Sequence, residues 1–155
     1  MSNDTKGGAQ STFRRTADTP VVYGTPISLD AAKKVAAAAE KEAAGNGWPM
    51  VIAIVDSTGH LAVLHKMDQA QFGSVAIAQA KAETALNFRR ATKVFEDSVA
   101  NGGRGLRVLE MGNVTGLEGG IPLLVNGEVV GAIGISGMQG HQDAQVAEAG
   151  AAALE

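Results

Sequence analysis

The sequence predicts an α+β domain built on a single, mainly antiparallel β-sheet. A continuous apolar, β-branched run at 50–55 is followed by a turn and a return strand at 60–67. A second pair of apolar runs, 123–125 and 129–135, is joined by Asn126-Gly127, a dipeptide that favours a two-residue hairpin. Alanine-rich segments with helical periodicity lie between and after these strands. We therefore expect about five strands, flanked by about four α-helices.

Composition indicates one domain at residues 23–155, preceded by a flexible N-terminal arm at 1–22. The arm is polar, rich in glycine, serine and threonine, and shows no periodicity. Hydrophobic residues make up 45% of the 155-residue chain, which is enough to bury a core. The arm lacks the apolar segment of a secretory signal, and no stretch approaches transmembrane length, so we expect a cytoplasmic protein.

Charge and cysteine content exclude several classes of function. The net charge of −3 gives no electrostatic basis for binding nucleic acid or an anionic membrane. The absence of cysteine excludes disulfides, thiolate nucleophiles and zinc–thiolate centres. His60 and His65 point to opposite faces of one predicted strand, so they do not clasp a metal within one subunit. We predict no metal site.

Two helices are expected in the first half of the chain. Ser28 is expected to cap the first one, which ends at Gly45-Asn46-Gly47. The second is expected from Val75 to about Ala91, and its alanines predict close packing on the sheet. One stripe of this second helix includes a lysine among otherwise apolar or small groups. The members of that stripe are Ile77, Lys81, Thr84 and Phe88.

The second half of the chain is less uniform. Thr92 is suited to cap a short helix that ends near Ala100, and residues 104–118 are compatible with either a strand or an irregular loop. In the strand at 129–136, strict alternation predicts two faces. One face carries Val129, Gly131, Ile133 and Ile135, and the other carries Val130, Ala132, Gly134 and Ser136. A final alanine-rich helix is expected at 139–154.

Three ordered blocks in this chain resemble the GlcG/HbpS-like family, whose members are often called haem-degrading or haem-binding. The first is Lys66-Met67-Asp68 followed by AxxKAxTAxxF at 78–88. The second is EGGIPL at 118–123, and the third is GxxxGAIGISG at 127–137, followed by QD and VAEAG. The resemblance implies one antiparallel sheet with flanking helices, in a domain that assembles into homo-oligomers. The family includes haem-binding proteins, a domain fused to a cobalamin adenosyltransferase, a protein of glycolate-utilisation operons, and a hydroxylaminobenzoate lyase.

Lys81 is the first candidate site residue, and it belongs to the first family block. Its ammonium is suited to bind a substrate carboxylate or a haem propionate, with Thr84 and Phe88 beside it. The alternative is a structural ion pair with Asp68 or Glu118. Arg89 offers a second cation for the same carboxylate.

His141 and Asp143 are candidates at the start of the last helix. A helix N-terminus favours neutral imidazole, the form that a haem iron or a general base requires. The alternatives are a solvated histidine and, for Asp143, an acid that stabilises the helix dipole. The turn Gly119-Gly120-Ile121 either offers backbone N–H groups to an anion or is a plain tight turn.

The leading hypothesis is a small-ligand-binding protein whose ligand is haem or another flat, carboxylate-bearing molecule. Its pocket would lie among the second helix, the 118–121 turn and the start of the last helix, with Phe88 packed on the flat ring. The alternative is a cofactor-independent lyase or isomerase on a small aromatic acid, such as a hydroxylaminobenzoate lyase releasing ammonia. There His141 and Asp143 or Glu118 would move protons. A third hypothesis is an oligomeric scaffold without chemistry.

Overall fold

A computed structural model of the chain describes residues 20–154. Their elements follow the order α1 (Leu29–Gly45), β1 (Val51–Asp56), β2 (Leu61–Lys66), α2 (Ser74–Phe88), α3 (Lys93–Ala100), the 3₁₀-helix η1 (Gly103–Glu110), β3 (Gly120–Val125), β4 (Glu128–Ser136) and α4 (Gly140–Ala152). Most of the predicted N-terminal arm, residues 1–19, lies outside the described residues. No helix within the described range is long and apolar enough to cross a bilayer.

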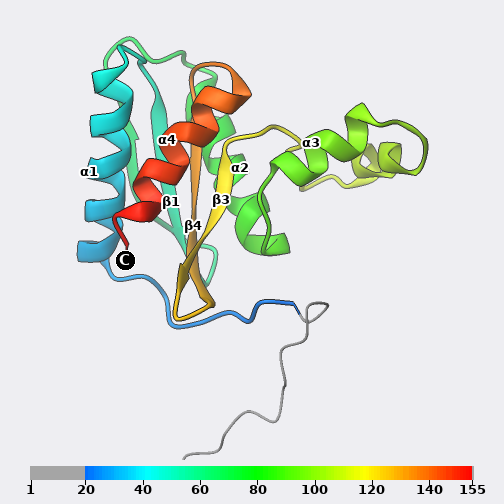
Figure 1. Cartoon of the computed structure of the whole chain (residues 1–155), viewed down its shortest axis with the longest axis horizontal. Coiled ribbons are helices and arrows are strands. Elements are labelled where there is room, and N and C mark those ends of the chain that lie inside the picture. Colours follow the sequence, from blue (N-terminus) through cyan, green and yellow to red (C-terminus); the bar gives the residue numbers. More distant parts are fainter. Residues whose placement is uncertain (1–19, 155) are drawn as a thin grey trace, which may run out of the picture.

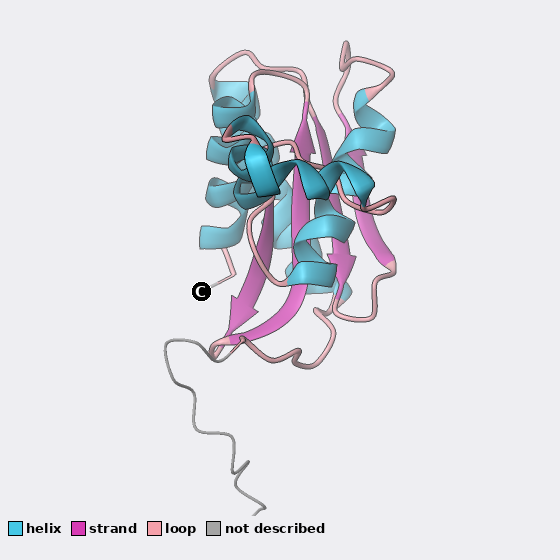
Figure 2. Cartoon of the chain, turned by 90° about the vertical axis from the view of Figure 1, so that its right-hand side faces the viewer, coloured by secondary structure: helices cyan, strands magenta, loops and turns pink. Residues whose placement is uncertain are grey.

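One antiparallel sheet with strand order β2-β1-β4-β3 confirms the predicted α+β class. Helices α1 and α4 cover one face of this sheet and α2 covers the other, so the body has three layers (Figures 1 and 2). The described residues form four strands rather than about five. Tyr23 adds an isolated parallel bridge to Val129 beyond the end of β1, and Gly24 N–H donates to the Val129 carbonyl at 2.8 Å.

Central strand β1 is buried on both faces, as its continuous apolar run predicts. Ile52 and Ile54 pack beneath α1 and α4, whereas Val51, Ala53 and Val55 pack beneath α2. Ser28 caps α1 as predicted, because its Oγ accepts a hydrogen bond from the Ala31 N–H at 3.1 Å. These apolar layers account for the core of the body.

The predicted alternation of β4 is wrong at its first two valines. Val129 faces the α2 side and Val130 faces the α1/α4 side. The cause is a β-bulge, since β3 pairs Leu124 with Val129 and Leu123 with Gly131, which leaves Val130 without a partner on β3. From Ile133 onward the predicted alternation holds.

Gly134 determines how closely α2 approaches the sheet. A Cβ at this position would overlap the Ala78 carbonyl oxygen and lie 2.5 Å from the Ala82 nitrogen, both in α2. The bare strand face predicted from the glycines therefore contacts helix backbone directly. Ser136, farther along the same face, donates a hydrogen bond to Ser74 Oγ at 3.0 Å.

Residues 93–110 form α3 and η1, which stand off the body as a projection (Figure 1). The segment at 104–118 is thus neither a strand nor wholly irregular, since 3₁₀ turns occupy its first part. Thr92 precedes α3 as expected, but its side chain does not cap that helix. Instead its Oγ1 accepts a hydrogen bond from the Gly120 N–H at 2.9 Å, which ties the base of the projection to β3.

Candidate functional site

A buried ion pair joins α2 to α4. Lys81 Nζ lies 2.8 Å from Asp143 Oδ2, and each side chain is only 3% exposed. The ammonium also donates to the Ile135 carbonyl at 2.8 Å, and Asp143 Oδ1 accepts from the Met138 N–H at 3.0 Å. Lys81 therefore has a structural carboxylate partner, but that partner is Asp143 rather than Asp68 or Glu118.

Burial raises the pKa of the Asp143 carboxyl above its ordinary value. Hydrogen bonding from Lys81, its positive charge and backbone N–H donors at Met138 and Gly137 each act in the opposite direction and only partly compensate. A carboxyl whose pKa is raised by desolvation beside a fixed cation is a recurrent feature of sites that move protons.

Gly119 covers the ion pair from the loop before β3. Its φ of +126° is rarely adopted by residues with a side chain. A Cβ there would lie 2.8 Å from Asp143 Cβ and 2.9 Å from Lys81 Nζ. The neighbouring Gly120 N–H donates to Thr92, so in this turn it is not available to an anion.

A cleft of about 390 Å³ opens over the ion pair; we call it the ion-pair cleft. From α2 its lining includes Ser74, Ile77 and Lys81. The opposite side of the cleft is acidic: Glu96 comes from α3, Glu118 from the loop that precedes β3, and Asp143 from α4. Its lining carries three carboxylates and one ammonium, and that ammonium is already paired. The electrostatics of this cleft therefore disfavour an added carboxylate.

The other predicted site residues do not converge on the ion-pair cleft. His141 is exposed in the first turn of α4 and is not part of the cleft lining. Thr84 is buried and accepts the Thr115 N–H at 3.0 Å. Arg89 donates to the Val21 carbonyl at 3.0 Å, and its guanidinium lies 5.1 Å from the centre of the Tyr23 ring, so it holds the segment before α1. Ile121 packs against the α1/α4 side of the core.

Phe88 instead lines a second cavity, of about 510 Å³, where the projection leaves α2; we call it the projection cavity. Its ring meets that of Phe95 edge to face, with centres 5.3 Å apart. The Arg90 guanidinium lies 5.9 Å from the centre of the Phe95 ring. The same cavity is also lined by Arg104, Arg107 and Met111.

Sequence reasoning missed the projection cavity. Of its lining, only Phe88 was a candidate, whereas Arg90, Arg104 and Arg107 were not. The sequence feature that could have indicated this cavity is the group of arginines that lies in and just before the non-periodic segment 104–118. Because Arg104 and Arg107 lie in the 104–118 segment, for which the sequence favours no single element, nothing indicates that they share one cavity with Phe88 and Arg90.

Histidine does not form a metal centre in the described part of the chain. His60 Nδ1 lies 2.7 Å from Thr58 Oγ1, and His65 Nδ1 lies 3.7 Å from a Glu40 carboxylate oxygen. Within residues 20–154 no three histidine or acidic side chains cluster in a way that would hold a metal ion.

Comparison with known proteins assigns the chain to a family. Residues 27–152 match the model of the family described as haem degrading protein HbpS-like. The chain belongs to this HbpS-like family. Protein GlcG from Escherichia coli K12 is 43% identical over 110 residues, which cover 71% of this chain and 81% of GlcG. A corrinoid adenosyltransferase, PduO from Citrobacter freundii, is 36% identical over 108 residues, but these cover only 32% of its length.

Solved structures of HbpS-like proteins share the fold. A double mutant of HbpS from Streptomyces reticuli superposes with a TM-score of 0.78 at 30% identity, covering 96% of this chain and 99% of that one. A complex of PduOC with haem superposes with a TM-score of 0.75 at 31% identity, covering 83% of this chain and 95% of PduOC. The family resemblance inferred from the three sequence blocks is thereby confirmed.

Proposed function

We propose that this HbpS-like chain is a small-ligand-binding protein and that its ligand is a flat, carboxylate-bearing molecule such as haem. The observation that carries the proposal is the projection cavity, in which two phenylalanine rings and three arginines line one space. Aromatic faces and edges stabilise a flat conjugated ring, while guanidinium groups bind carboxylates in a planar, bidentate geometry. The haem complex of PduOC, a relative of matching fold, supports the same class of ligand.

The structure changes which residues we assign to this ligand. Lys81 is committed to Asp143 inside an acidic cleft, so the carboxylates are assigned to Arg90, Arg104 and Arg107. Phe88 keeps its expected role against the flat ring. Bound haem would supply its own iron chemistry. Among the described lining of the projection cavity, the Met111 thioether is a group of a type that ligates haem iron, whereas His141 lies outside that lining.

Titration of the full chain with hemin tests this proposal. Saturable binding should shift the Soret band, and Met111→Leu should change the position of that band while binding is retained. Val94→Leu, a conservative change at the same cavity, serves as the matched control and should leave the band where it is. A Soret band that remains that of free hemin at all protein concentrations would overturn the proposal.

A second candidate function is favoured by Asp143. Its raised pKa, its position in the ion-pair cleft and the nearby Glu118 suit proton transfer by a cofactor-independent lyase or isomerase on a small aromatic acid, whose own carboxylate would lie outside this acidic cleft. Release of ammonia from hydroxylaminobenzoate by the purified protein, abolished in Asp143→Asn without loss of the folded circular-dichroism spectrum, is the result this candidate requires. Absence of ammonia release from the wild type contradicts it.

A further inference from the structure

Two carboxylates of the ion-pair cleft have no close cation in the described part of the chain. Glu96 and Glu118 are half-buried, and neither side chain forms an ion pair or a hydrogen bond within residues 20–154. The charge of Lys93 acts on both, but the Lys93 ammonium lies 2.8 Å from Asp97. An opposite charge offsets the cost of partly removing a carboxylate from water. This side of the cleft is therefore suited to bind a cation.

The floor of the same cleft has two buried donors with hydrogens that no described residue accepts. Lys81 has three ammonium hydrogens, of which the Ile135 carbonyl and Asp143 accept two. The Ser74 hydroxyl accepts a hydrogen bond from Ser136, but its own hydrogen has no acceptor in the described part of the chain. Lys81 and Ser74 both line the cleft and are only 3% and 2% exposed. Because buried donors are normally hydrogen-bonded, the two indicate an oxygen atom of a ligand beside them.

The remaining lining limits the class of cation. The lining has no aromatic ring, and its larger apolar side chains are those of Ile77, Leu117 and Met138. Quaternary ammonium groups are recognised by aromatic cages, so this cleft does not suit them. A primary ammonium group has three N–H donors, which form charge-assisted hydrogen bonds with carboxylates. The volume of about 390 Å³ is at the small end of the range found for ligand sites.

We propose that the ion-pair cleft binds a small aliphatic primary amine in its protonated form, with a hydroxyl or carbonyl oxygen close to the ammonium group. The ammonium group binds Glu96 and Glu118, and the oxygen accepts hydrogen bonds from Lys81 and Ser74. Lys81 keeps its ion pair with Asp143, so ligand binding does not disturb the contact between α2 and α4. This site is separate from the projection cavity, and it rests on neither of the functions proposed above.

Isothermal titration calorimetry on the full chain tests the class of ligand, with ethanolamine as the probe. We expect saturable binding of ethanolamine at neutral pH and low salt. Glycolate, which has a carboxylate where ethanolamine has its aminomethyl group, should not bind, because the cleft is acidic. Choline, whose nitrogen has no hydrogen to donate, should bind at least about tenfold more weakly than ethanolamine. Absence of saturable ethanolamine binding, or equal affinities for ethanolamine and either of the other two probes, would overturn the proposal.

A pair of charge-matched variants tests the carboxylates. Glu96→Gln/Glu118→Gln conserves side-chain shape and should weaken ethanolamine binding at least about tenfold. Glu83→Gln/Glu148→Gln removes the same charge from two exposed positions of α2 and α4 outside the cleft lining, and should leave the affinity unchanged. Equal losses in the two variants would mean that ethanolamine is attracted by the net charge of the protein rather than by a site, and would contradict the proposal.

Ser74→Ala tests the contact with the ligand oxygen. Propylamine has the charge of ethanolamine and a methyl group in place of its hydroxyl, so the wild type should prefer ethanolamine. In Ser74→Ala the binding of ethanolamine should weaken at least about twofold, whereas that of propylamine should not change. Melting temperatures of both proteins check that the variant is folded. A wild type that binds the two amines equally, or a preference that persists in full in Ser74→Ala, would contradict the assignment of the oxygen to this hydroxyl.

Discussion

Lys81 and Asp143 hold α2 and α4 together across the end of the sheet. Their charged atoms are 2.8 Å apart and both side chains are almost wholly buried, although 62 residues separate them in the sequence. The remaining hydrogen bonds of the pair come from backbone groups at Ile135 and Met138.

Lys81→Met is expected to destabilise the fold by about 3–5 kcal/mol, because it leaves an unpaired buried carboxylate. The double variant Lys81→Met/Asp143→Leu should lose less, since it removes both desolvated charges. Urea unfolding of the four proteins of this cycle measures the coupling. Additive losses would show that the two charges do not act as a pair.

The pH dependence of Lys81→Met follows from the direction of the pKa shift. Burial already raises the pKa of Asp143 in the folded protein. The Lys81→Met substitution removes the hydrogen bond and the positive charge of Lys81, both of which lower that pKa. The unfolded value is about 3.9. A folded pKa above the unfolded one means that the ionised carboxylate costs stability as pH rises through the folded value. The deficit of Lys81→Met relative to wild type should therefore shrink as pH falls from 7 toward 4.5, measured by melting temperature. A deficit that grows on acidification has the wrong sign.

Gly119→Ala should destabilise the protein by about 1–3 kcal/mol from backbone strain alone. The new methyl group would also crowd Asp143 Cβ and the Ile135 carbonyl, each 2.8 Å away. Gly45→Ala, at the end of α1 with no neighbouring atom within 4 Å of the added Cβ, is the control. Chemical denaturation should place this control at or above wild type, and equal losses for both variants would exclude a special role for Gly119.

Gly134→Ala tests whether helix backbone rests directly on β4. A methyl group there would overlap the Ala78 carbonyl, and forced overpacking of this kind costs about 1–3 kcal/mol. Gly73→Ala, just before α2 and free of neighbours within 4 Å, should be tolerated. Thermal unfolding distinguishes the two, and an unaffected Gly134→Ala would mean that α2 lies farther from the sheet than described.

Local sequence signals predicted the body of the fold well. The β-branched run of β1, the Asn126-Gly127 hairpin and the Ser28 cap each depend on a few neighbouring residues, and all three are present. The bulge at Val130 depends on the register of β3, which no pattern within β4 encodes. That single unpaired residue is why the two valines face the opposite way.

The candidate site was predicted only in part, because it depends on contacts distant in sequence. Helical spacing correctly marked Lys81 as an unusual lysine, yet its partner is supplied by another helix. Phe88 and Lys81 share one stripe of α2 but line different cavities, since the end of α2 points toward the projection. A short helix ending near Ala100 was expected, and α3 is that helix. No periodic signal marks η1, whose 3₁₀ turns and exposed leucines fit neither a regular helix nor a strand.

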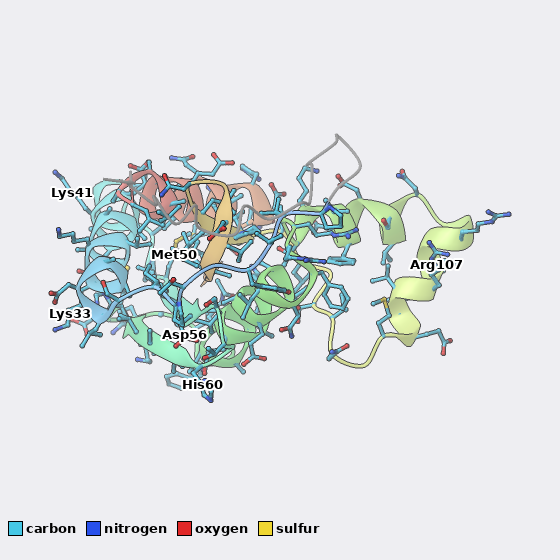
Figure 3. All side chains as sticks on the ribbon, turned by 90° about the horizontal axis from the view of Figure 1, so that it is seen from below. Lys33, Lys41, Met50, Asp56, His60 and Arg107 are labelled. Carbon is cyan, nitrogen blue, oxygen red and sulfur yellow. The ribbon has the colours of Figure 1, made fainter. Side chains whose placement is uncertain are left out.

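The central claim is that arginines of the projection bind the carboxylates of a flat ligand. Its most direct measurement is the dissociation constant of hemin for Arg104→Gln/Arg107→Gln, compared with Lys33→Gln/Lys41→Gln. The second variant loses the same charge from α1, at the opposite end of the molecule from Arg107 (Figure 3). We predict binding at least about tenfold weaker for the arginine variant, equivalent to about 1.4 kcal/mol, and unchanged for the lysine variant. Equal affinity in both variants would contradict the account.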